Sequence, residues 1–155
     1  MKVEPTTMIA KDAFIDLRTL NEAGCTAGGN TQTKDVGLVH IDKMYWKNAQ
    51  HGAWFYKTSS ISLTVKGPCT VYLAKNPYNG TSYAISTEDN TKLSATTVNA
   101  TVEEASGTIA ANCTDLSSDA ENPSFQYTGT GEAVITIAWT DTSNEAYLPA
   151  VQVKY

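Results

Sequence analysis

Residues 61–74 read Ile61-Ser62-Leu63-Thr64-Val65-Lys66-Gly67-Pro68-Cys69-Thr70-Val71-Tyr72-Leu73-Ala74. Apolar and polar side chains alternate in both halves of this stretch, with the period of two that a strand with one buried face requires. Gly67-Pro68 separates the halves, and a glycine–proline pair marks a turn. The stretch therefore predicts two strands, residues 61–66 and 69–74, joined as a β-hairpin.

The rest of the chain repeats this alternation between clusters of Gly, Pro, Asp, Asn and Ser, and helix signals are nearly absent. The 22 threonines and 8 tyrosines also favour strands. Further strand candidates are residues 14–17, 83–86, 107–110, 125–127, 133–139 and 147–153; residues 76–80 and 115–123 are predicted loops, and residues 140–145 a hairpin-like connection. Short strands at this spacing predict an all-β fold, a two-sheet antiparallel β-sandwich of jelly-roll-like form.

Size and charge limit the possible organisation and partners. The chain has 155 residues and is 41% hydrophobic, which suits one domain; we expect residues 12–155 to form it and residues 1–11 to be a tail or linker. Eleven Lys and Arg against sixteen Asp and Glu leave no basic face for phosphates, so we expect no nucleic-acid partner. No apolar run reaches the ~18 residues of a membrane span, so we expect no membrane partner either.

The ends of the chain bear on its location. Residues 1–5 lack the apolar stretch of a secretory signal, and the chain begins abruptly and stops on a predicted strand. Its character nevertheless suits an extracellular domain. We expect a secreted or cell-surface domain excised from a longer protein.

The three cysteines, Cys25, Cys69 and Cys113, cannot all pair, and no two have the spacing of a metal or redox motif. Two interpretations stay open. The cysteines are buried as small apolar side chains, or one disulfide joins Cys69 to Cys113 while Cys25 stays free.

Motifs for catalysis and metal binding are missing from the sequence. It contains no Gly-x-Ser-x-Gly, no His-Glu-x-x-His, no phosphate-binding loop and no dinucleotide fingerprint, and its only histidines are His40 and His51. Glu103-Glu104 is interpreted as a solvated edge rather than a catalytic pair. The oxygen-rich loops at residues 87–90 and 117–119 lack the spacing of an EF-hand. We therefore expect no enzyme, no metal and no cofactor.

Aromatic residues gather between residues 44 and 56, which read Met-Tyr-Trp-Lys-Asn-Ala-Gln-His-Gly-Ala-Trp-Phe-Tyr. If Ala53 and Phe55 face the core, the period of two turns Trp54 and Tyr56 to the opposite face. The alternative is that all these rings pack in the core or at its rim. Trp139 differs, because it shares parity with the apolar residues of 133–139 and is predicted to be buried.

Outward aromatic rings beside neutral polar side chains suit sugar recognition, because a pyranose stacks its C–H face on a ring while its hydroxyls take hydrogen bonds. The candidate site combines an aromatic platform with interleaved polar groups. Its residues are Trp46, Trp54 and Tyr56, with Asn48, Gln50, His51 and Lys57 between and after them, and with Tyr78 and Tyr83, which flank the loop at 76–80, as an extension.

Four segments together resemble the non-catalytic β-sandwich modules attached to secreted polysaccharide-degrading enzymes, especially pectate lyases and pectin esterases. They are Gln50-His51-Gly52-Ala53-Trp54, residues 61–71, Phe125-Gln126-Tyr127-Thr128-Gly129 and residues 146–153. The resemblance implies a carbohydrate-binding module that holds a tethered catalytic domain near plant cell-wall polysaccharide, whether pectin, xylan or glucan. The alternative hypothesis is a structural or adhesive β-sandwich domain of a surface protein or a phage appendage.

Overall fold

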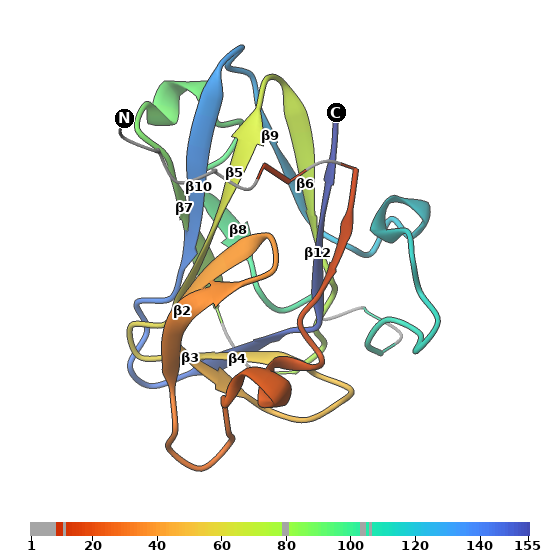
Figure 1. Cartoon of the computed structure of the whole chain (residues 1–155). Helices are drawn as coiled ribbons and strands as arrows, with labels where there is room; N and C mark the ends of the chain where they lie inside the picture. The colour runs from red at the N-terminus through yellow and green to blue at the C-terminus, as the bar shows by residue number, and fades with distance from the viewer. Residues whose placement is uncertain (1–8, 11, 79–80, 103–104, 106) are drawn as a thin grey trace, which may run out of the picture.

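The computed structural model describes residues 9–10, 12–78, 81–102, 105 and 107–155, and these form an all-β molecule (Figure 1). Three short 3-10 helices interrupt the loops: η1 (Leu20–Ala23), η2 (Asn90–Lys92) and η3 (Leu116–Ser118). The described strands are β1 (Phe14–Asp16), β2 (Gln32–Val36), β3 (Val39–Trp46), β4 (Ala53–Tyr56), β5 (Ser60–Lys66), β6 (Cys69–Leu73), β7 (Ser82–Ser86), β8 (Thr97–Asn99), β9 (Ser124–Tyr127), β10 (Glu132–Ala138), β11 (Glu145–Leu148) and β12 (Ala150–Lys154).

Two antiparallel sheets pack against each other, which confirms the predicted sandwich. The smaller sheet has the order β1-β12-β6-β9, and the larger one has the order β11-β4-β3-β5-β10-β7-β8, with β2 paired to β3. The larger sheet is strongly curled, so that β4 lies across the base of the molecule in Figure 1 while β5 and β10 run upward.

A bulge in β3 produces part of this curl. Lys43 has a positive φ of 50°, and the register with β2 shifts there. The side chain of Thr33 fixes the bulge, because its hydroxyl accepts from the Lys43 N–H at 3.1 Å and donates to Asp42 at 2.9 Å. The extra residue resets the alternation, as bulges do. Before the bulge β3 pairs with β5, and after it with β4.

The predicted hairpin at residues 61–74 is wrong, although both of its strands exist. β5 pairs with β3 and β10, while β6 pairs with β12 and β9 in the other sheet. Gly67-Pro68 therefore carries the chain across the sandwich. Residues 128–131 make the same crossing between β9 and β10, and the Gly67 N–H donates to the Gly131 carbonyl at 3.0 Å. The two neighbouring crossings form one corner, in which φ of +87° at Gly67 turns the chain.

Proline also marks a second crossing that the sequence pattern did not reveal. The predicted single strand 147–153 is divided at Pro149 into β11, which pairs with β4, and β12, which pairs with β1 and β6. The predicted connection at 140–145 is likewise not a hairpin, because β10 and β11 have different neighbours. Residues 107–110 form no strand, and the candidate at 14–17 shortens to β1.

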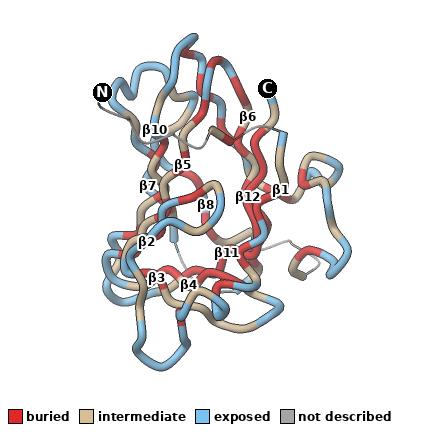
Figure 2. Tube along the Cα trace, viewed as in Figure 1, coloured by how far each residue is buried: buried red, intermediate tan, exposed pale blue. Residues whose placement is uncertain are grey.

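Burial follows the strands and leaves most of the connections exposed (Figure 2). Trp139 is 1% exposed, which confirms its predicted core position. Residues 1–8 and 11 lie outside the described residues, so the predicted tail can be compared with the structure only at Ile9 and Ala10. Ile9 bridges to Thr64 of β5, and Ala10 is buried, donates its N–H to Thr64 at 2.8 Å and accepts from the Tyr155 hydroxyl.

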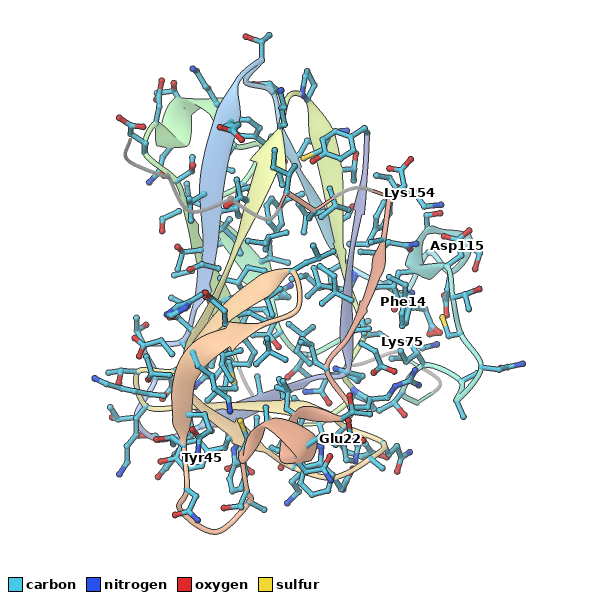
Figure 3. The ribbon with its side chains drawn as sticks, in the orientation of Figure 1. Phe14, Glu22, Tyr45, Lys75, Asp115 and Lys154 are labelled. Atoms are coloured by element: carbon cyan, nitrogen blue, oxygen red, sulfur yellow. The ribbon has the colours of Figure 1, made fainter. Side chains whose placement is uncertain are left out.

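The long segment before β9 is tied to the smaller sheet by buried polar contacts. Leu116 donates its N–H to the Gln152 side chain at 2.7 Å, and Asn122 accepts from the Lys75 N–H at 2.8 Å. The Lys75 ammonium, on a side chain only 6% exposed, contacts Asp119 at 2.8 Å and Glu121 at 2.9 Å. Figure 3 shows this segment projecting beside the sheet. The predicted solvated edge at Glu103-Glu104, and Asn79-Gly80 of the predicted loop, lie outside the described residues.

All three cysteines are free, so the alternative disulfide between Cys69 and Cys113 does not form. Cys25 and Cys69 are buried and belong to the core, while Cys113 is half-buried. Burial raises the pKa of the Cys69 thiol to about 11. The first interpretation of the cysteines, as small apolar side chains, is confirmed for Cys25 and Cys69.

Candidate functional site

The candidate site is an aromatic row on the outer face of β3, β4 and β11. Antiparallel pairing places Tyr45 opposite Trp54 and Trp54 opposite Tyr147. Ala53 and Phe55, the neighbours of Trp54 on β4, are fully buried, so the row faces away from the core. The predicted outward orientation of Trp54 and Tyr56 is therefore confirmed. We call Tyr45, Trp54, Tyr56 and Tyr147 the aromatic patch.

The rings of the patch pack edge to face and at an angle rather than lying in one plane. Ring centroids are 5.4 Å apart for Tyr45 and Trp54, 6.2 Å for Trp54 and Tyr56, and 6.4 Å for Trp54 and Tyr147. These separations lie within the favourable range for aromatic pairs, which are worth roughly 0.5–1.5 kcal/mol each beyond their buried area. Mutual packing thus holds the rings in position without any ligand.

Two lysines lie over the rings of the patch. The Lys47 ammonium is 5.2 Å from the ring centre of Trp54 and 5.5 Å from that of Tyr147, and the Lys57 ammonium is 5.4 Å from that of Tyr56. Such cation–π contacts are worth ~0.5–1 kcal/mol at exposed sites. The patch therefore carries positive charge, although the whole chain has a net charge of −5. One carboxylate is close, because the Tyr147 hydroxyl donates to Glu145 at 2.6 Å.

His51 and Tyr78 extend the patch at one side. The His51 ring lies 5.0 Å from Tyr147 and 5.4 Å from Tyr78, which is 51% exposed. Burial lowers the pKa of His51, and the neighbouring Lys47 ammonium lowers it further, which favours the neutral imidazole. A neutral imidazole has one donor and one acceptor nitrogen, and in His51 one of the two, Nδ1, is buried.

The loop between β3 and β4 positions His51. The Asn48 side chain accepts from the Gln50 N–H at 2.9 Å and from the His51 N–H at 2.8 Å, and the Gly52 N–H donates to the Asn48 carbonyl at 2.9 Å. Asn48 is thus occupied in shaping the loop, although it was predicted to contact ligand. Gln50 reaches the other way and donates to Thr108 at 3.2 Å.

Two buried nitrogens at the patch have no hydrogen-bond partner among the described residues. They are Nε1 of Trp54 and Nδ1 of His51. An unsatisfied buried polar atom costs ~1–3 kcal/mol, and native proteins contain few of them. Both nitrogens belong to side chains of the candidate site.

The structure separates two predicted site residues from the others. Trp46 lies opposite Ala53, on the core side of the sheet, and donates its indole N–H to the Arg18 carbonyl at 2.8 Å. Tyr83 is 1% exposed and packs edge-on against Phe55 and Trp139. Burial raises its pKa above the ordinary range. Neither ring can contact a ligand bound at the aromatic patch. Trp46 lies two residues after buried Met44 on β3 and therefore faces the core, and the side chain of Tyr83 on β7 also points into the core.

Of the predicted residues, the structure brings together Trp54, Tyr56, His51, Lys57 and Tyr78. Sequence reasoning missed Tyr45 and Tyr147. Of the three lysines around the tryptophans that an acidic ligand would need on the binding face, Lys43, Lys47 and Lys57, the structure places Lys47 and Lys57 over the rings of the patch. Alternation with the buried Met44 could have indicated that Tyr45 faces outward. Tyr147 belongs to a strand that pairs with β4 across almost one hundred residues of sequence, and no local signal predicts that pairing.

The loops that resembled calcium sites make local contacts instead. Asp89 accepts from the Thr91 N–H at 3.1 Å, and Asp115, next to the loop at 117–119, accepts from the Ser117 N–H at 3.0 Å. Within residues 9–155, excluding the undescribed positions, no three His, Cys, Asp or Glu side chains gather as a metal site would require. The described part of the chain also has no helix long and apolar enough to cross a membrane.

Comparison with known proteins adds no relative to this picture. No protein-family model, no curated protein and no solved structure matches the chain. The resemblance to modules of polysaccharide-degrading enzymes consequently rests on the quoted sequence segments alone.

Proposed function

We propose that this chain is a non-catalytic carbohydrate-binding module and that the aromatic patch is its binding surface. The observation that carries the proposal is the group of half-buried rings Tyr45, Trp54 and Tyr56 on the outer face of the curled sheet, with Tyr147, which is only 5% exposed, packed against Trp54. Rigid strands and ring-to-ring packing fix the row, and a preorganised surface loses little entropy when a ligand binds. Structural aromatics would more commonly lie inside, as Tyr83 and Trp139 do.

The chemistry around the rings matches a sugar. Tyr45, Trp54 and Tyr56 are half-buried, so part of each ring is open to a C–H face. Neutral His51 and the ammonium groups of Lys47 and Lys57 can pair with ligand oxygens around the rings. Because such a site is shallow and wet, we expect a modest affinity, in the micromolar to millimolar range that corresponds to roughly −8 to −4 kcal/mol.

The lysines favour an acidic polysaccharide over a neutral one. Lys47 lies over the rings of Trp54 and Tyr147, and Trp54 is the half-buried ring of the two, on which a sugar would stack. A uronic acid would pair its carboxylate with the ammonium and keep that charge at the patch, whereas a neutral sugar would have to displace it. Among the predicted ligands, we therefore propose pectin ahead of xylan and glucan. The module would be secreted or at the cell surface and tethered to a catalytic domain.

The proposal is tested by isothermal titration calorimetry, which measures the binding of polygalacturonate, xylan and a soluble β-glucan to the protein. We expect Trp54→Ala to weaken the binding of polygalacturonate by about tenfold or more, since a stacking surface is lost (a tenfold change is about 1.4 kcal/mol). Tyr83→Phe is the matched control, because it changes a core tyrosine whose hydroxyl has no partner among the described residues. Circular dichroism and melting curves establish that both variants fold.

Ionic strength separates the ligand classes. Binding of an acidic polymer to Lys47 and Lys57 should weaken between 50 and 300 mM salt, because the Debye length falls below ~10 Å over that range. Undiminished binding by both Trp54→Ala and Tyr45→Ala would exclude the patch as the site. Failure of the unmodified protein to bind any of the three polymers would favour the alternative, a structural or adhesive domain of a surface protein or phage appendage.

A further inference from the structure

We infer that the molecule has a second ligand site, a groove on the outer face of the smaller sheet that takes one or two residues of a neutral oligosaccharide. The groove has a volume of about 450 Å³, within the ~300–1,000 Å³ usual for small-molecule sites. It is lined by Pro68, Cys69, Thr70, Tyr72, Gln126, Tyr127, Thr128, Lys154 and Tyr155. This site is separate from the aromatic patch and does not depend on it.

Strand register places the polar groups of the floor side by side. Thr70 of β6 lies opposite Gln126 of β9 on one side and opposite Lys154 of β12 on the other. Tyr72 follows two residues along β6, so its side chain points to the same face. Val71, Leu73 and Phe125, on the alternate positions, are buried in the core. The row therefore faces outward across three rigid strands.

The floor offers free hydrogen-bonding groups. The side chains of Thr70, Tyr72 and Gln126 make no hydrogen bond to any described residue. Together they present a hydroxyl, a phenol and a primary amide, which can both donate and accept. Groups of this kind suit the vicinal hydroxyls of a sugar, each of which is also donor and acceptor.

The groove is close to electrically neutral. Lys154 is the one charged side chain among the described residues that line it, and its ammonium contacts Asp115 at 2.9 Å and Ser117 at 2.8 Å. Because Asp115 already pairs with Lys154, this lysine would contribute little electrostatic attraction to an anionic ligand. This feature contrasts with the patch, where Lys47 and Lys57 lie over rings, and it is why we assign a neutral ligand.

An exposed ring held in a fixed position borders the groove. Tyr155 is 49% exposed, yet its hydroxyl donates to the Ala10 carbonyl and accepts from the Lys66 N–H at 3.1 Å, while its N–H donates to Asp12 at 3.0 Å. A ring immobilised at both ends gives the groove a rigid wall at low entropy cost. Figure 3 shows Lys154 on the upper right side of the molecule and Tyr45, of the patch, at the lower left.

The experiment is an amide NMR titration of the full chain with cellohexaose, xylohexaose and hexagalacturonate. At millimolar concentrations at least one neutral hexasaccharide should shift the amides of residues 69–72, 126–128 and 154–155 in a saturable way. Tyr155→Ala should weaken this binding about tenfold and Gln126→Ala about threefold. Gln126 is exposed, so its replacement tests the site even if Tyr155→Ala unfolds. Val134→Ala, at an exposed position of the other sheet, is the matched control.

The two sites are distinguished by a cross-test. Trp54→Ala should leave the groove amides responsive to the neutral probe, whether or not the patch binds sugar. Shifts confined to the patch, or no shift with either neutral hexasaccharide, would overturn the inference and leave the proposed function untouched. A groove response to hexagalacturonate alone would overturn the assignment of a neutral ligand.

Discussion

Gly52→Ala is predicted to destabilise the molecule through a collision with backbone rather than with flexible side chains. Gly52 has φ of +71°, and a Cβ there would lie 2.8 Å from Pro149 Cα, 2.9 Å from the Leu148 carbonyl oxygen and 3.1 Å from the Leu17 carbonyl oxygen. These atoms belong to the crossing between β11 and β12 and to the segment after β1. The loop that carries His51 can pack against them only because residue 52 has no side chain.

The expected magnitude combines three contributions. An L residue in the left-handed region costs ~1–2 kcal/mol, and forcing a methyl group into a packed site costs ~1–3 kcal/mol. Alanine stiffens the unfolded chain, which offsets ~0.4–1 kcal/mol of this. The net loss is about 3 kcal/mol at the middle of the range, or a fall in melting temperature of about 6–12 °C for a domain of this size.

Gly37→Ala separates the two unfavourable contributions. Gly37 also has a positive φ, +58°, but no atom lies within 4 Å of a Cβ built there. Its replacement should cost only the conformational part, about 0.5–1 kcal/mol. Urea denaturation of both variants gives the comparison directly. If Gly52→Ala costs no more than Gly37→Ala within about 0.5 kcal/mol, the crossing at Pro149 yields freely and the steric reasoning is wrong.

Two further predictions concern titration and thiol chemistry. A hydrogen bond from Lys154 and then one from Ser117 lower the pKa of Asp115 from 3.8 to about 2, and a hydrogen bond from Lys75 lowers the pKa of Asp119. Because a carboxyl group with a lowered pKa stabilises the fold above about pH 4, the free energy of unfolding measured in urea should fall between about pH 4 and 2. In Lys75→Met this fall should be less steep. At pH 8 a thiol reagent such as dithionitrobenzoate should modify half-buried Cys113 first, and should modify Cys69 only as the protein unfolds. Rapid modification of Cys69 in the native state would contradict its burial.

Local alternation located five strands closely because it is a property of neighbouring residues, but it did not identify β2, β3 or β8. β5, β6, β7, β9 and β10 all lie within a residue or two of their predicted bounds. Pairing is different, since it depends on which distant strand offers a complementary apolar face. Gly67-Pro68 therefore looked like a hairpin turn and is a corner between sheets, while Pro149 lay within an apparently continuous strand and interrupts it.

The candidate site shows the same division. Parity alone turned Trp54 outward correctly, because Ala53 and Phe55 are a reliable guide within one short strand. Trp46 was wrongly predicted to face outward, because the bulge at Lys43 shifts the alternation of inward and outward side chains along β3 by one residue. Tyr147 could not be found from sequence, as it joins the patch only through the pairing of β11 with β4.

The hydrogen bond between Tyr155 and Ala10 bears on how the molecule can be attached to a carrier. It brings the two described extremities of the chain together, at the end remote from β4 in Figure 1. Immobilisation on a bead or fusion to another protein through Tyr155 would leave Tyr45 and Trp54 unobstructed. A bulky carrier on Tyr155 would at the same time crowd the groove beside it, so the side chosen for a tag determines which surface an assay can sample.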